Sequence, residues 1–194
     1  MGYMRHSLGY GFGFVQVAGV YKVIQIWYAA CHEEPFYADF LCDVGSNNDV
    51  RFDIYNSGSN SWKQMDVKVP HDIRYLLRFE LFFNGAIHWY AVTATHNSPC
   101  ILCFDMSSED FGLLDFHDNF PLPERDLKLV VLNDCLTMVS YSQWNTERCE
   151  IWVMKEYGVK ESWTKQFVVE PYCSISPFLF SYLACFGCVF ELSL

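Results

Sequence analysis

Nine cysteines and six histidines are the side chains of this sequence with the greatest capacity for chemistry. Two cysteine pairs, Cys100–Cys103 and Cys185–Cys188, have the CxxC spacing of zinc ligands. The first pair lies in an apolar run that reads as a β-strand, where residues i and i+3 face opposite sides of a sheet. A zinc knuckle needs a turn at that point. We therefore expect buried thiols that act as small apolar side chains, with no metal and no other cofactor.

Motifs of hydrolases and nucleotide-binding proteins do not occur in the sequence. There is no G-x-S-x-G and no H-E-x-x-H, and a Cys–His hydrolase would need its nucleophile and base in contact. His88 stands beside Trp89 in a strand-like run, which is typical of a structural histidine. The stretch GYGFGF (9–14) is not G-x-G-x-x-G, and it predicts a β-turn and a strand in which glycine admits close backbone packing. We expect a protein that is not an enzyme.

Acidic residues are a third group of candidate functional side chains. The chain has 13 Lys and Arg against 23 Asp and Glu, a formal net charge of −10 and a pI of about 4.9. This balance argues against nucleic acid, whose phosphates need clustered basic residues, and favours a basic protein partner through electrostatic steering. The alternative is that the charge only keeps an aromatic-rich protein soluble. The acidic residues in predicted loops are Glu33, Glu34, Asp43, Asp49, Glu109, Asp110, Asp115 and Asp118.

The composition predicts a large core rich in aromatic rings, in a cellular compartment that keeps thiols reduced. Hydrophobic residues make up 52% of the 194 residues and aromatic residues 18%, enough for one substantial domain. The cysteines are odd in number and irregular in spacing, no Asn-x-Ser/Thr sequon occurs, and the N-terminal residues lack a signal-peptide pattern. These features predict a cytoplasmic or nuclear location.

One apolar segment, 175–190, raises the question of a membrane span. It runs for about 16 residues, whereas a spanning helix needs roughly 20. Pro177, Ser181 and Gly187 interrupt it. We expect a buried strand pair or a divergent tail, and no membrane partner.

Alternating and aromatic runs predict that β-strands position these residues, because helical periodicity is rare in the chain. Many short strands at this spacing predict an all-β sandwich, barrel or propeller. The expected strands are Tyr21–Tyr28, Val50–Tyr55, Arg78–Phe83, Ala86–Ala94, Cys100–Phe104, Leu127–Leu132, Leu136–Tyr141 and Glu150–Lys155.

An internal repeat with a period of about 49 residues organises the strands. Three pairs of landmarks are each 49 positions apart: Tyr55 and Phe104, Trp62 and Phe111, Asn84 and Asn133. Asn84-Gly85 and Asn133-Asp134 predict type I′ hairpins, whose two turn residues have positive φ. A third copy begins at Ile151 and reaches Trp163 through a loop two residues longer.

Each predicted unit consists of a strand, a polar turn, an aromatic residue, a link, a strand, a hairpin and a strand. A unit of about 49 residues has the size of a kelch-like propeller blade. We expect the aromatic residue after the turn to pack between neighbouring blades, because one blade cannot bury both faces. The expected anchors of the repeat are Trp62, Asn84, Gly85, Trp89, Phe111, Asn133 and Trp163.

Several phrases of the sequence carry a resemblance to a known family. They are GYGFGF, YKVIQI, VRFDIYNSGSNSW, FFNGAIHWYA, ILCFDMSSEDF and IWVMKEYGVKESW. Over roughly residues 9–171 the chain resembles the F-box-associated domain of plant F-box proteins, and most closely that of the S-locus F-box proteins and their brothers. The resemblance implies the target-recognition module of an SCF-type ubiquitin ligase. In the S-locus group the target is a basic pistil ribonuclease, S-RNase, recognised in gametophytic self-incompatibility.

The sequence also departs from this family. No F-box precedes Gly9, so binding of a Skp1-type adaptor is expected only with an F-box upstream. We expect residues 1–172 to form an incomplete β-propeller-like domain and residues 173–194 a divergent apolar tail. Such a propeller should not close, should expose strand edges and should aggregate. The alternatives are a nonfunctional truncated fragment, or a small propeller that is an enzyme or binds a ligand.

Overall fold

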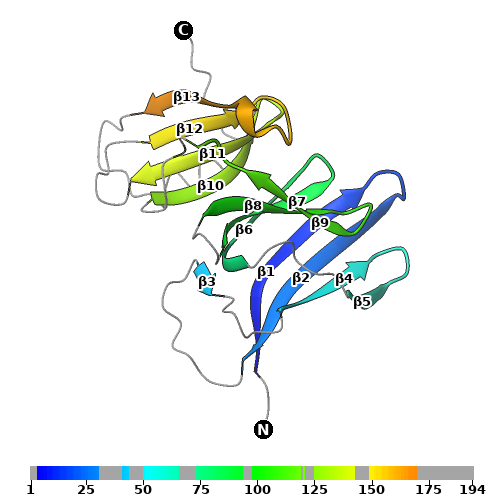
Figure 1. Cartoon of the computed structure of the whole chain (residues 1–194). Coiled ribbons are helices and arrows are strands. Elements are labelled where there is room, and N and C mark those ends of the chain that lie inside the picture. The colour runs from blue at the N-terminus through cyan, green and yellow to red at the C-terminus, as the bar shows by residue number, and fades with distance from the viewer. Residues whose placement is uncertain are drawn as a thin grey trace. The chain divides into compact units, whose positions relative to one another are not determined.

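The computed structural model describes residues 4–30, 41–43, 50–65, 73–93, 98–118, 120, 125–142 and 149–169 of the chain. These residues form thirteen strands and one short 3₁₀ turn, η1 (Lys160–Ser162) (Figure 1). The strands are β1 (Met4–Val15), β2 (Val20–Ala30), β3 (Leu41–Asp43), β4 (Val50–Asn56), β5 (Ser61–Met65), β6 (Ile73–Phe83), β7 (Ala86–Thr93), β8 (Pro99–Asp105), β9 (Asp110–Asp115), β10 (Arg125–Leu132), β11 (Cys135–Ser142), β12 (Cys149–Met154) and β13 (Trp163–Val169).

The strands form three antiparallel sheets, which confirms the all-β, partial propeller-like fold. The first sheet has the order β1-β2-β4-β5, the second β3-β6-β7-β8-β9 and the third β10-β11-β12-β13. All eight strands expected from the sequence are present. Of the other five strands, β1 contains the strand expected at GYGFGF, whereas β3, β5, β9 and β13 are additional to the expected set.

The chain divides into two compact units. Met1–Phe120 contains the first and second sheets, and Pro121–Leu194 contains the third. The expected boundary between residues 172 and 173 lies outside the described residues.

The two hairpin predictions are confirmed. Asn84-Gly85 joins β6 to β7 with φ of 49° and 76°, and Asn133-Asp134 joins β10 to β11 with φ of 49° and 56°. Both turn residues of each hairpin therefore lie in the left-handed region that a type I′ turn needs.

The 49-residue period is confirmed, but the predicted unit does not coincide with a sheet. Tyr55 pairs with Trp62, Phe104 with Phe111 and Met154 with Trp163, so each sheet carries the same pair of strands around its polar turn. However, the other neighbour of β4 is β2, which precedes it, and the hairpin β6–β7 that follows belongs to the second sheet. The second sheet contains the β6–β7 hairpin and then β8 and β9, and the third contains β10–β11 and then β12 and β13. The predicted unit instead began at the strand before the polar turn, which is one strand pair later. A repeat in sequence defines a period but not where each sheet starts.

The first and second sheets of the Met1–Phe120 unit share one hydrophobic core. Its central side chains include Ile24 and Phe52 from the first sheet and Ile87, Trp89 and Phe104 from the second. The Trp89 indole is fully buried and donates a hydrogen bond to the Tyr10 carbonyl oxygen at 3.2 Å. Trp89 thus ties the two sheets together.

Strand β1 is the element that allows this close approach. Gly9, Gly11 and Gly13 are buried on the face toward the second sheet, while Tyr10 and Phe12 point the other way. A Cβ at Gly11 would lie 2.5 Å from Ile87 Cδ1, and one at Gly13 would lie 2.4 Å from a ring carbon of Phe82. The expected close packing of the GYGFGF stretch is confirmed.

The aromatic residues after the three polar turns differ in their surroundings. The Phe111 ring lies 4.6 Å from Phe52 and 4.8 Å from Phe104, so it packs between two sheets as predicted. Trp163 is buried. The prediction for Trp62 is wrong in the described structure, because its side chain is 54% exposed and contacts Tyr55 within its own sheet.

Candidate target-binding surface

The turn between β8 and β9 leads into two adjacent acidic candidates, Glu109 and Asp110. Asp105 orders this turn, since its Oδ1 accepts hydrogen bonds from the backbone N–H groups of Ser107 and Ser108, both at 2.8 Å. Glu109 adopts φ of 61° and donates its N–H to the Asp105 carbonyl oxygen at 3.0 Å. The turn is therefore held by its own polar groups.

Glu109 is tied to the first sheet by an ion pair. Lys22 Nζ, on β2, lies 2.7 Å from Glu109 Oε1 and also donates to the Met106 carbonyl oxygen at 2.6 Å. Lys63 Nζ lies 3.6 Å from Glu109 Oε2. The hydrogen bond from Lys22 lowers the pKa of Glu109. Lys22 is buried, so the pair links the turn to the neighbouring sheet, and Glu109 contributes little unpaired charge for a partner.

The other predicted acidic residues of the second sheet do not form one cluster. Asp110 begins the edge strand β9 and is paired across it with Asp105, whereas Asp115 ends the same strand opposite Cys100. A strand of this length separates its end residues by about 17 Å. Asp118 follows in a turn, and all three aspartates are exposed. The acidic edge consists of these three residues, Asp110 and Asp115 at the two ends of β9 and Asp118 three residues beyond it. Charges on an edge strand also discourage its pairing with another chain.

The remaining acidic candidates have little or no structural description. Asp43 ends β3, where it is paired with Tyr75. Glu33, Glu34 and Asp49 lie outside the described residues.

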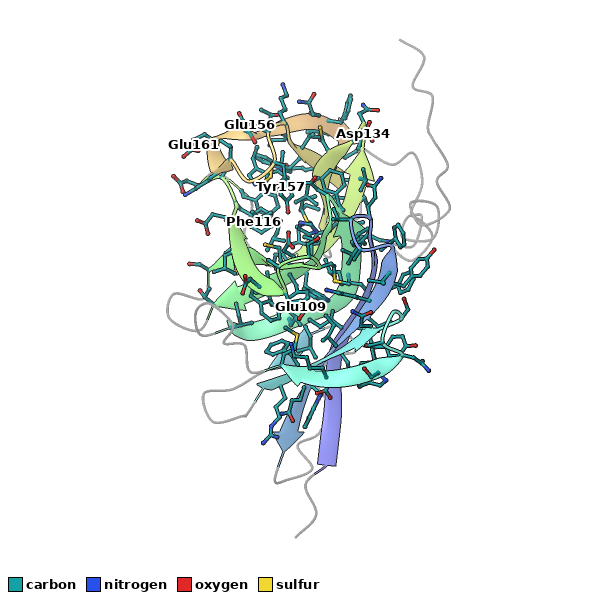
Figure 2. All side chains as sticks on the ribbon, turned by 90° about the vertical axis from the view of Figure 1, so that its right-hand side faces the viewer. Glu109, Phe116, Asp134, Glu156, Tyr157 and Glu161 are labelled. Carbon is teal, nitrogen blue, oxygen red and sulfur yellow. The ribbon has the colours of Figure 1, made fainter. Side chains whose placement is uncertain are left out.

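The β12–β13 connection of the second unit carries acidic residues that the sequence reasoning missed. Figure 2 labels Glu156, Tyr157 and Glu161 there, and both glutamates are exposed. Ser162 Oγ donates to the carbonyl oxygens of Glu156 and Val159, and the loop has the two extra residues that were predicted. Lysines at 155 and 160 balance the local charge, so the segment did not stand out as acidic.

The cysteines of β8 lie on opposite faces of their strand, as predicted. Cys100 belongs to the core shared by the first two sheets, whereas Cys103 is paired with His88 on the other face. Burial raises the pKa of Cys100 to about 12 and also raises that of Cys103. Both thiols are therefore protonated at neutral pH, which makes them poor nucleophiles.

His88 is a fully buried side chain inside the second sheet. Its Nδ1 lies 3.2 Å from the Leu81 carbonyl oxygen, which can only accept, so Nδ1 carries the proton. Burial lowers the pKa of His88 to about 4, and the ring is neutral at pH 7. This geometry is that of the structural histidine expected from the sequence.

Neither a metal cluster nor a spanning helix is found in the described part of the chain. Within it, no three His, Cys, Asp or Glu side chains gather as metal ligands. In the same residues, no helix has the length and apolar character needed to cross a bilayer. Cys185–Cys188 and the apolar segment 175–190 lie outside that part.

Residues 3–186 of the chain match the family model of the F-box associated beta propeller domain. The chain belongs to this family. Its three antiparallel sheets with a 49-residue offset are the blade-like units of that domain. The family matches the resemblance seen in the sequence, at the level of the F-box-associated domain.

Several curated relatives of this F-box-associated domain come from Arabidopsis thaliana. F-box protein At3g07870 is 28% identical over 179 residues, which cover 88% of this chain and 42% of the relative. F-box protein CPR1 is 27% identical over 189 residues, covering 90% and 43%. Putative F-box/kelch-repeat protein At3g22730 is 27% identical over 186 residues, covering 93% and 45%. The chain spans less than half the length of these relatives.

Proposed function

We propose that this domain is the target-recognition part of an F-box protein, the subunit that selects substrates for an SCF-type ubiquitin ligase. The observation that carries the proposal is the family match over residues 3–186, together with relatives that are named F-box proteins. In this role the domain binds a protein and transfers nothing itself, because ubiquitin transfer belongs to other subunits. A Skp1-type adaptor would bind an F-box and not this domain.

The target that we propose is a basic protein, of the S-RNase type, in the cytoplasm. The net charge of −10 supports a basic partner, since opposite charge raises the rate of encounter. The acidic edge of β9, formed by Asp110, Asp115 and Asp118, offers exposed carboxylates for this contact. The resemblance of the quoted phrases to S-locus F-box proteins supports a pistil ribonuclease over other basic proteins.

The test is binding of purified pistil ribonucleases to the immobilised chain, measured by biolayer interferometry at 50 and 200 mM salt. Lysozyme, a basic protein without relation to S-RNase, serves as the control analyte. We expect at least one ribonuclease to bind more tightly than lysozyme, with an association rate that falls as salt rises. If no ribonuclease exceeds lysozyme, the S-RNase assignment is wrong, and the general role would need another target.

A triple reversal, Asp110→Lys with Asp115→Lys and Asp118→Lys, tests the acidic edge. The matched control reverses three exposed acids of the second unit, Asp134→Lys with Glu156→Lys and Glu161→Lys. Each substitution adds two charges, so both variants have a net charge of about −4. We expect the first variant to slow association by about tenfold and the control by much less. Equal effects would mean that only net charge matters.

A further inference from the structure

Asn84 stands in the only Asn-Gly sequence of the 194 residues. The side-chain amide of an asparagine can be attacked by the backbone nitrogen of the next residue, which closes a succinimide ring. Glycine favours this attack, because no Cβ crowds the attacking nitrogen. Asparagine is accordingly one of the thermolabile residues of proteins. Asn84 is therefore the first asparagine of this chain to consider as a site of chemical modification.

Four asparagines lie among the described residues, and the structure separates them by how their side-chain amides are held. Asn56 Oδ1 accepts a backbone N–H and Asn60 Oδ1 accepts a tyrosine hydroxyl, both at 2.8 Å. Such hydrogen bonds oppose the rotation that brings the amide carbon to the next backbone nitrogen. The side chains of Asn84 and Asn133 make no hydrogen bond to another described residue, so they are free to rotate.

The turn at Asn84-Gly85 also leaves the attacking nitrogen accessible. The ladder of β6 and β7 closes with the pair Phe83 and Ala86, so the N–H of Gly85 lies outside the ladder. Both turn residues are exposed, and nothing beyond the chain neighbours lies within 4 Å of a Cβ placed on Gly85. Attack at this turn therefore breaks no ladder hydrogen bond and meets no packed side chain.

The third sheet contains a matched turn in which another residue replaces the glycine. Asn133 has the same φ of 49° as Asn84, and Asp134 follows it with φ of 56° where Gly85 has 76°. Asp134 adds a Cβ and a negative charge beside the nitrogen that would attack, and both slow its deprotonation and its approach. The two hairpins thus compare the same turn with and without the favourable nucleophile.

We propose that Asn84 is a site of spontaneous deamidation, with water as the co-reactant. Hydroxide removes the N–H proton of Gly85, and the nitrogen forms a bond to Asn84 Cγ. The bond from Cγ to the amide nitrogen then breaks, and ammonia leaves after taking a proton from water. A water molecule opens the ring at one of its two carbonyl carbons, which gives aspartate or isoaspartate. No group is oxidised or reduced in these steps.

The two products differ in their effect on the hairpin. The backbone of isoaspartate runs through the former side-chain carbon, so the two-residue turn gains one carbon and loses its type I′ geometry. That turn sets the register of β6 with β7, which carries the buried Trp89 of the core. Isoaspartate therefore weakens the second sheet. Aspartate adds one negative charge but keeps the turn, because Asp-Gly also forms type I′ turns.

The test is peptide mass spectrometry of the whole folded chain during incubation at 37 °C and pH 8.5. Deamidation adds about 1 Da to a peptide, and chromatography separates its isoaspartyl and aspartyl forms. We expect conversion at Asn84 to be at least about tenfold faster than at Asn133. Gly85→Asp copies the turn of the third sheet and should lower the rate at Asn84 to that of Asn133. The reciprocal variant, Asp134→Gly, should raise the rate at Asn133.

Equal conversion at Asn84 and Asn133 would overturn the proposal, as would rates that do not follow the glycine in the two variants. A chain in which Asn84 reacts only when urea unfolds it would also overturn the proposal, because the folded turn then protects the amide. The melting temperature measures the structural effect. It should fall as the isoaspartyl fraction rises, whereas Asn84→Asp should melt like the parent chain. An aged chain that melts like fresh chain would contradict the weakening of the second sheet.

Discussion

At the scale of single residues, the role of a charged side chain depends on its neighbours in space more than on the loop of the sequence in which it lies. Glu109 was grouped with the acidic surface because its sequence context is that of a solvated turn. In the folded chain it faces Lys22, which is 87 positions away and buried. No local pattern of the sequence predicts a contact between residues 87 positions apart. This contact makes Glu109 a link between two sheets and not a residue that binds a partner.

Substitution of Glu109 by Gln should destabilise the fold. The change removes the carboxylate that compensates the buried Lys22 cation, and we expect a loss of about 2 kcal/mol in the free energy of unfolding. Lys63→Met removes the other, more distant cation, which is 71% exposed, and should cost less than about 0.5 kcal/mol. Urea denaturation of both variants measures the difference. Equal losses of unfolding free energy in the two variants would show that the Lys22–Glu109 ion pair does not contribute more to stability than the contact of Lys63.

His88 should make stability depend on pH. Its pKa is about 4 in the folded chain and 6.5 ordinarily, so the unfolded chain binds the proton at a higher pH. The contribution is fully present above pH 6.5, and the free energy of unfolding should fall by about 3 kcal/mol between pH 6.5 and pH 4. Urea denaturation at several pH values compares the parent chain with His88→Gln. If the free energy of unfolding of the variant falls as steeply with pH between 6.5 and 4 as that of the parent, His88 does not cause the pH dependence.

At the scale of elements, hairpins and strands follow from local sequence, while their pairing does not. The type I′ turns at Asn84-Gly85 and Asn133-Asp134 could be predicted because positive φ is a property of the turn residues themselves. The pairing of β2 with β4 could not, since residues 31–49 intervene and no local preference spans them. This pairing decides where each sheet begins and explains why the predicted unit straddled two sheets.

The two hairpins offer a matched pair of substitutions that should change the free energy of unfolding in opposite directions. Gly85 has φ of 76° and Asp134, at the equivalent position, has φ of 56°. Gly85→Ala should destabilise by about 1 kcal/mol through backbone strain alone, because nothing lies within 4 Å of the added Cβ. Asp134→Gly should stabilise by about 0.5 kcal/mol. Thermal unfolding measures both, and two changes of the same sign would contradict the turn assignment.

At the scale of the whole molecule, the compact unit Met1–Phe120 depends on contact between its two sheets. Both contribute to a single core, and the glycine face of β1 sets how closely they approach. A disturbance at that face should therefore affect both sheets together and not remain in the first.

A pair of glycine substitutions tests this coupling. Gly11→Ala places a Cβ 2.5 Å from Ile87 Cδ1 and should cost about 1–3 kcal/mol, whereas Gly9→Ala meets Trp89 at an ordinary 3.5 Å and should be nearly neutral. Hydrogen exchange should show faster opening of β2 and β7 alike in the Gly11 variant. Loss of protection confined to β1 and β2 would show that the sheets unfold independently.

The sequence by itself determined most of the strands, the two Asn-type hairpin turns, the 49-residue period and the family resemblance. These depend on residue alternation and on turn residues, which act over a few positions of the chain. Only the tertiary structure decided which aromatic residue after a turn is covered. Trp62, Phe111 and Trp163 occupy equivalent places in the repeat, yet Trp62 is exposed, Phe111 lies between two sheets and Trp163 is buried. The physical reason is that burial and ion pairing depend on what lies opposite a side chain in space, and a period along the chain does not contain that information.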